Sequence, residues 1–137
     1  MRHVGFMGGS SMVELGTASE MMDFFNFINK RLEGKESNEI AIRLYSKYIK
    51  LEQLEELYSM VKDIKSMLSS DEDKYFKYLS GIETCIESAK FFYNSWGVYQ
   101  PVKVAVTDAP YYIEDKNRPL EHYDELKPNE TPFWLRQ

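Results

Sequence analysis

The sequence has little of what ordinarily reveals a function. Cys85 is the only cysteine among 137 residues, which excludes an intramolecular disulfide and a cluster of thiolate metal ligands. No apolar run approaches the length of a membrane span. The N-terminus also lacks the charged region and apolar stretch of a secretory signal. A cytoplasmic protein is therefore predicted.

Positive charge is also scarce. Lys and Arg number 17 against 22 Asp and Glu, which gives a net charge of −5. A nucleic-acid or anionic-membrane binder needs a basic face to neutralise phosphates, so neither partner is expected, and a basic protein would suit the chain better. Aromatic residues are abundant, with ten Tyr, eight Phe and two Trp. Such rings supply buried area, and Tyr and Trp are also favoured at interfaces.

Recognisable catalytic and cofactor motifs are missing. The sequence has no Gly-x-Ser-x-Gly turn, no phosphate-binding loop and no dinucleotide fingerprint. Cys85 lies in "GIETCIESAKFF", a helical pattern in which a small buried thiol is expected rather than a nucleophile. We therefore assign no catalytic residue, cofactor or metal ligand and interpret the chain as a protein without enzymatic activity.

The first sixteen residues lack hydrophobic periodicity. The stretch "MRHVGFMGGSSM", with its Gly-Gly-Ser-Ser run, predicts a flexible leader or a cloning remnant over residues 1–16. His3 is excluded from any site on that ground. A single globular domain is expected over residues 17–137.

Three or four helices are predicted between residues 17 and 97. Thr17 and Glu20 have the spacing of a capping box, and apolar residues at helical spacing follow as far as Gly34, an expected C-cap. The region Ser37–Ser69 contains neither Gly nor Pro and predicts a long amphipathic helix, divided in two near Ile49. Its apolar stripe could pack within the domain or complete a homodimer.

The last predicted helix begins near Ser70 and ends at Gly97. The acidic triplet "DED" after Ser70 suits the first turn of a helix, which explains it without a bound cation. Apolar residues at helical spacing are expected to form the buried face, and these are Tyr75, Phe76, Leu79, Ile82, Ile86, Ala89, Phe92, Tyr93 and Trp96.

The chain after residue 97 changes character, and all five prolines lie there. The stretch "VKVAV" at 102–106 alternates as a half-buried strand does. "YYI" at 111–113 predicts a second short strand, and "PFWL" near the end predicts a third strand or a docked tail. The expected fold is α+β and mainly α, with a helical body at 17–97 followed by a small β and loop section at 98–137.

The segment "YYIEDKNRPLEHYDEL" combines tyrosines and carboxylates in a loop-like context. Exposed rings can anchor a partner while acids steer a positively charged one, although the same rings could instead fold back over the helices. His122, flanked by carboxylates, could alternatively centre a hydrolase or a metal-dependent enzyme. The candidate partner-binding residues are Tyr111, Tyr112, Glu114, Asp115, Glu121, Tyr123, Asp124, Glu125 and Trp134.

The module "WGVYQPVKVAVTDAPYYIEDKNRPLEHYDEL" behind an acidic helical body resembles the immunity proteins of bacterial toxin–immunity pairs, including those of contact-dependent inhibition. The resemblance implies a small cytoplasmic inhibitor that binds a cognate toxin domain and occludes its active site. The implied toxin is a nuclease with a basic substrate groove. An adaptor or regulatory protein with an ordinary cellular partner is the alternative.

Overall fold

The computed structural model describes residues 3–107 and 132–135. These residues form an α+β fold that is mainly α, which confirms the predicted class. The α-helices are α1 (Ala18–Arg31), α2 (Asn38–Ser46), α3 (Leu54–Ser66) and α4 (Phe76–Trp96). The strands are β1 (His3–Gly8), β2 (Ser11–Thr17) and β3 (Lys103–Val106), and short 3-10 helices are η1 (Leu51–Gln53), η2 (Ser70–Tyr75) and η3 (Phe133–Leu135).

Residues 3–8 and 11–17 are strands of the sheet, so the prediction of a flexible leader over residues 1–16 is wrong from His3 onward, the part of it that the structure describes. β1 pairs antiparallel with both β2 and β3, which gives the strand order β2-β1-β3. Val4 and Phe6 of β1 are fully buried. The central strand of the sheet therefore comes from the segment that looked least structured in the sequence.

The Gly-Gly-Ser-Ser run is the turn of the β1–β2 hairpin. Gly9 has a φ of +58°, a conformation that favours glycine at the first position of a two-residue hairpin turn. The turn also packs directly on α4. A Cβ on Gly8 would lie 2.7 Å from the carbonyl oxygen of Cys85, and a Cβ on Gly9 would lie 2.3 Å from that of Ser88. The two glycines thus permit a close approach of hairpin and helix.

β3 is buried on both faces. The strand predicted at 102–106 is present, but Lys103 and Ala105 are buried as well as the valines. The expectation of a half-buried strand is therefore wrong, because alternation in the sequence did not correspond to alternating exposure. Just before this strand, Val102 forms an isolated bridge with Ile49. The N–H of Ile49 donates to the carbonyl oxygen of Val102 at 2.9 Å.

That bridge explains why the long helical region divides near Ile49, as predicted. α2 ends at Ser46, Ile49 pairs with the sheet, and helical structure resumes at Leu51. A chain that pairs with a strand for one residue leaves the helical backbone conformation there. The predicted division thus has its cause in a contact with a segment more than fifty residues away.

Most helix ends follow their expected signals. The N–H of Glu20 donates to Thr17 Oγ1 at 3.2 Å and the N–H of Thr17 donates to Glu20 Oε1 at 3.1 Å, which confirms the capping box. Gly97 ends α4 with a φ of +70°. Gly34 is not the C-cap of α1, because Leu32 holds that position.

The predicted start of the last helix also needs correction. Ser69, not Ser70, is the N-cap, and its N–H donates to Glu72 Oε1 at 3.1 Å. The capped turn is the 3-10 helix η2, and α4 begins only at Phe76.

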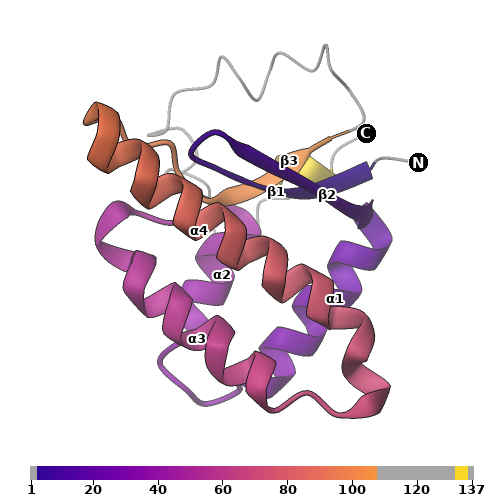
Figure 1. Ribbon diagram of the computed structural model, residues 1–137. Helices are drawn as coiled ribbons and strands as arrows, with labels where there is room; N and C mark the ends of the chain where they lie inside the picture. The colour runs from indigo at the N-terminus through magenta and orange to yellow at the C-terminus, as the bar shows by residue number, and fades with distance from the viewer. Residues whose placement is uncertain (1–2, 108–131, 136–137) are drawn as a thin grey trace.

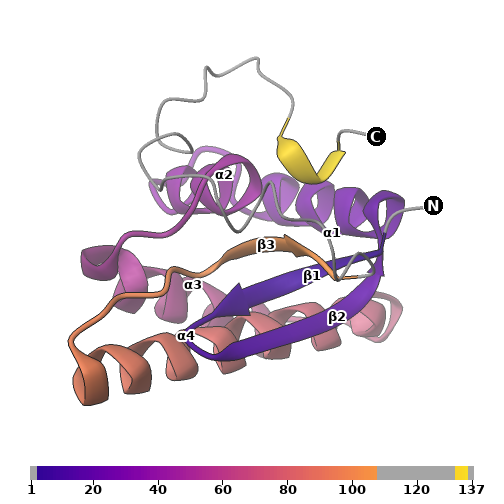
Figure 2. The ribbon, with the colours of Figure 1, turned by 90° about the horizontal axis from the view of Figure 1, so that it is seen from above.

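The sheet lies along one side of the helical body (Figures 1 and 2). α4 packs against β1 and β2, while α2 contacts β3. Phe6, Phe24 and Phe25 meet edge to face at centroid distances from 5.4 to 6.4 Å and form the aromatic centre of the core. None of the helices in the described ranges has the length and apolar character required to cross a membrane.

Candidate protein-binding surface

The residues predicted to bind a partner fall into two groups. All but Trp134 lie within 108–131, outside the described residues, and they are Tyr111, Tyr112, Glu114, Asp115, Glu121, Tyr123, Asp124 and Glu125. The strand predicted at 111–113 and His122 lie outside them too. Trp134 is described, and only 1% of its surface is exposed.

Trp134 is a core residue, which corrects its assignment as a surface anchor. Its indole Nε1–H donates to the carbonyl oxygen of Tyr45 at 2.8 Å, and its ring lies 5.4 Å from the Tyr45 ring and 6.1 Å from that of Phe25. The "PFWL" stretch therefore docks against the body, as a 3-10 turn rather than a strand. A Trp whose N–H is satisfied inside the protein contributes to folding rather than to binding.

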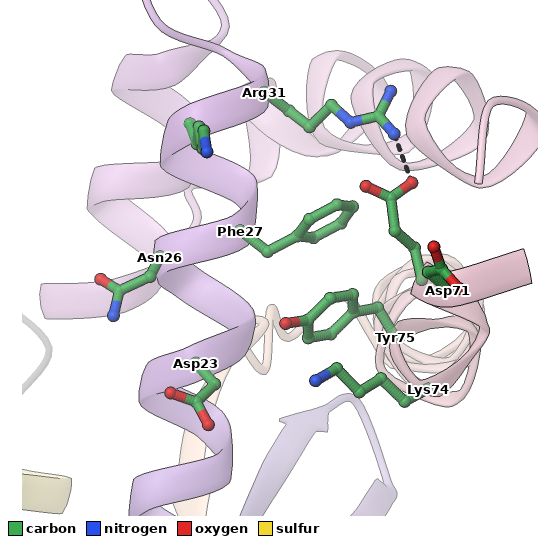
Figure 3. Close-up of a pocket in the computed structure, with 9 residues that line it drawn as sticks. Asp23, Asn26, Phe27, Arg31, Asp71, Lys74 and Tyr75 are labelled. Carbon is green, nitrogen blue, oxygen red and sulfur yellow. Dashed lines mark hydrogen bonds and ion pairs between the residues drawn. The ribbon is translucent and has the colours of Figure 1, made fainter. Parts of the chain in front are cut away.

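A cleft of about 770 Å³ opens between α1 and η2 (Figure 3). Phe27 and Tyr75 stack inside it with ring centroids 4.3 Å apart and an angle of 13° between the rings. The Arg31 guanidinium lies 5.5 Å from the Phe27 centroid, and the Lys74 ammonium lies 5.2 Å from that of Tyr75. We call these four layered side chains the α1–η2 clasp.

Ion pairing closes one side of the cleft. Arg31 forms an ion pair with Glu72, drawn as the dashed line in Figure 3. The backbone N–H of Ser69 and the Arg31 guanidinium both lower the pKa of Glu72, and the Ser69 hydrogen bond has the larger effect. Each ring of the clasp is thus covered by a cation, and Arg31 is also paired with Glu72. The clasp therefore joins α1 to η2, just before α4 begins.

Cys85 is fully buried, as the sequence predicted. Burial raises the pKa of its thiol to about 12, so the thiolate required of a nucleophile does not form at neutral pH. Over the parts of the chain that the structure describes, His, Cys, Asp and Glu side chains do not gather in threes that could hold a metal ion.

The apolar stripe of α4 continues beyond the elements that cover it. Ile82, Ile86 and Ala89 are fully buried against the body. Phe92, Tyr93 and Trp96 continue this stripe at helical spacing, and the sequence placed them on the buried face. That expectation is wrong for Tyr93 and Trp96, whose exposed fractions are 38% and 72%. It is also wrong for Phe76 at the start of the helix, which is 47% exposed.

We call residues 91–98 the α4 end, and Figures 1 and 2 show it at a corner of the molecule. Phe91 is 72% exposed and Val98 49%, in addition to Trp96. The sequence from Phe91 to Val102 contains no charged residue. The α4 end therefore presents several large apolar side chains on a regular helix, and sequence reasoning missed it.

The local structure holds the α4 end in place. The N–H of Gly97 donates to the carbonyl oxygen of Tyr93 at 2.8 Å in a left-handed cap, which stops the helix just after Trp96. The returning chain is then fixed by Tyr99, whose hydroxyl donates to the carbonyl oxygen of Ile49. Burial raises the pKa of Tyr99, so this donor stays protonated at neutral pH.

Carboxylates lie beside the α4 end. Glu87 is one turn before Phe91 on the same helix and is exposed. On the neighbouring helix, Glu55 forms an ion pair with Lys90, and Glu56 is exposed next to it. Glu87 therefore lies on the same side of α4 as Phe91, whereas Trp96 projects about 140° away from Phe91 around the helix axis.

Comparisons with protein-family models, with curated proteins and with solved structures find no match to this chain.

Proposed function

We propose that the protein is a cytoplasmic immunity protein that binds a cognate bacterial toxin domain, such as a nuclease, and occludes its active site. The observation that carries this proposal is the exposure of Phe91, Tyr93 and Trp96 on the last turns of α4. Trp and other large rings that stay exposed together, with polar residues at their border, are typical of protein interaction sites. Phe91 and Trp96 are the most exposed rings among the described residues.

The mechanical support of the surface favours tight binding. The buried half of α4 is fixed between the sheet and α3, and the Lys90–Glu55 ion pair joins the two helices close to the α4 end. A rigid helix loses little conformational entropy when a partner docks, so more of the contact energy appears as affinity. Inhibition by occlusion needs such a preformed surface and no catalytic group.

The charge of the chain supports a basic target. A nuclease domain requires a positively charged groove to hold its substrate, and a protein of net charge −5 would be drawn towards it electrostatically. Complementary charge raises the association rate, which matters for an inhibitor that must act before the toxin does.

The test has two stages. The tagged protein is used to capture its partner from the lysate of its host, and the captured domain is then produced in cells with and without this chain. We expect a toxin domain at equal stoichiometry, whose lethality this chain suppresses. A captured housekeeping protein without any rescue would contradict the immunity role and favour an adaptor.

A further inference from the structure

Several rings of this protein are covered by its own cations. The Lys65 ammonium lies 4.6 Å from the centroid of Phe76, and both Lys62 and Lys90 lie 5.4 Å from that of Tyr58. The same arrangement occurs at Phe27, Tyr75 and Tyr78, each with an Arg or Lys between 5.2 and 5.5 Å from the ring centroid. The electron-rich face of an aromatic ring attracts a cation, so these rings have a favourable partner already.

The rings of the α4 end differ in this respect. Within the described ranges, no Lys or Arg lies over Phe91 or Trp96, although each is 72% exposed. Lys90 directly precedes Phe91, yet its ammonium is directed to Glu55 and the Tyr58 ring. Among the described residues, two exposed ring faces therefore remain without a cation of their own, and Glu87 lies one turn before Phe91 on the same side of the helix.

We propose that the α4 end receives Lys and Arg side chains of a basic partner protein, with Trp96 and Phe91 as the ring faces that accept them. This inference rests on the proposed function and adds the chemistry of recognition to it. Trp has the most strongly attracting ring face for a cation. Glu87 is exposed one turn before Phe91 on the same side of α4, where it can pair with a further basic group of the same partner.

A basic partner fits this surface better than a second copy of the chain. Two copies of the chain repel each other, because each carries a net charge of −5. Like charges brought together at an interface are unfavourable. An anionic membrane would meet the same repulsion.

The test uses hexa-arginine as a probe and hexa-citrulline, its uncharged near-isostere, as a control, with affinity measured by calorimetry. Trp96→Leu and Phe91→Leu keep an apolar side chain and the charge of the protein but remove the aromatic face. Phe76→Leu is the matched control, because Phe76 is 47% exposed and already lies under Lys65. We expect hexa-arginine to bind and hexa-citrulline not to.

Each of the two variants at the α4 end should weaken hexa-arginine binding about two- to five-fold, the range for an exposed cation–ring contact. Phe76→Leu should leave the affinity unchanged. Equal binding by wild type and Trp96→Leu, or equal binding of the two peptides, would overturn the proposal. The proposal would also be overturned if the protein formed a dimer in sedimentation, or bound phosphatidylcholine vesicles, and Trp96→Leu abolished that association while peptide binding stayed unchanged.

The rescue assay separates failure of this inference from failure of the proposed function. If the wild type suppresses the toxin and Trp96→Leu suppresses it equally, the immunity function stands and the α4 end is not its binding surface. If the wild type gives no rescue, the immunity function fails, whatever the peptide measurements show.

Discussion

The two ends of α4 carry similar aromatic residues in opposite circumstances. At the start, Tyr78 is buried and stacks on Phe24 with centroids 4.9 Å apart, and Phe76 lies under Lys65, whose ammonium also forms an ion pair with Glu83 at 2.5 Å. At the other end, Phe91 and Trp96 are exposed. An apolar stripe thus indicates which face of a helix is favoured for burial, and the neighbouring elements determine how much of that face is buried.

The two ends of α4 are therefore expected to have different roles, one in stability and one in binding. The first part of α4 meets the β1–β2 hairpin, α3 and η2, so substitutions there should change the stability of the fold. The last turns carry little of that packing, so substitutions there should change binding and leave stability nearly intact. The expected effects below run from the largest to the smallest.

The largest contrast is expected between Ile86→Ala and Trp96→Ala. Ile86 is fully buried, so truncation removes apolar contacts and leaves a cavity, which should lower the free energy of unfolding by about 2–5 kcal/mol. Trp96 is 72% exposed, and its truncation should change stability by less than about 0.5 kcal/mol. Denaturant titration measures both. A large loss from Trp96→Ala would mean that the α4 end is structural.

The hairpin turn gives the next contrast, between Gly9→Ala and Gly34→Ala. Both glycines have positive φ, +58° and +78°, so each substitution should cost about 1–2 kcal/mol for the backbone alone. A Cβ on Gly9 would also clash with the Ser88 carbonyl of α4, whereas nothing lies within 4 Å of one on Gly34. Denaturant titration of Gly9→Ala should therefore show the larger loss. Equal losses would contradict close packing of the turn on α4.

The clasp should contribute less. Phe27→Leu keeps an apolar side chain but removes the stack with Tyr75 and the cation contact with Arg31, which should cost about 0.5–1.5 kcal/mol. Phe91→Leu is the matched control, because Phe91 is 72% exposed at the opposite end of α4. Thermal unfolding compares the two variants. A control as destabilised as Phe27→Leu would remove the distinction between the two ends.

Low pH should weaken the cap at η2, and we expect the resulting loss in the free energy of unfolding to be the smallest of these effects. The pKa of Glu72 is lowered in the folded protein by the Ser69 N–H and by Arg31, so the unfolded chain binds a proton more readily. The resulting stability is present above the ordinary pKa of 4.5 and is lost as the pH falls through the lowered value. Glu72→Gln should therefore flatten the pH dependence of unfolding below about pH 5. An unchanged profile, matching that of Glu36→Gln, would contradict this.

Much of the helical body could be predicted from the sequence because its signals are local. The Thr17–Glu20 capping box and the Gly97 terminator act within a few residues, and both are present. The hairpin could not be predicted in the same way. The role of Gly8 and Gly9 depends on the backbone of Cys85 and Ser88, and no local pattern reports an approach across that separation.

The candidate site could be predicted only in outline. An aromatic surface near acids was expected, but it was sought after residue 110, and Trp134 belongs to the core instead. The α4 end was missed because Trp96 continues the buried periodicity of its helix. The usable signal was the uncharged aromatic run from Phe91 to the terminator Gly97, where the helix stops.

The most direct test of the binding surface is the accessibility of Trp96 in the complex. In a Trp134→Phe variant Trp96 is the only tryptophan, because the chain has two. Its fluorescence is measured with increasing acrylamide, with and without the captured toxin domain. We predict efficient quenching in the free protein, and strong protection with a blue-shifted emission in the complex. Unchanged quenching at saturating partner would show that the α4 end stays in water and would contradict its role in binding.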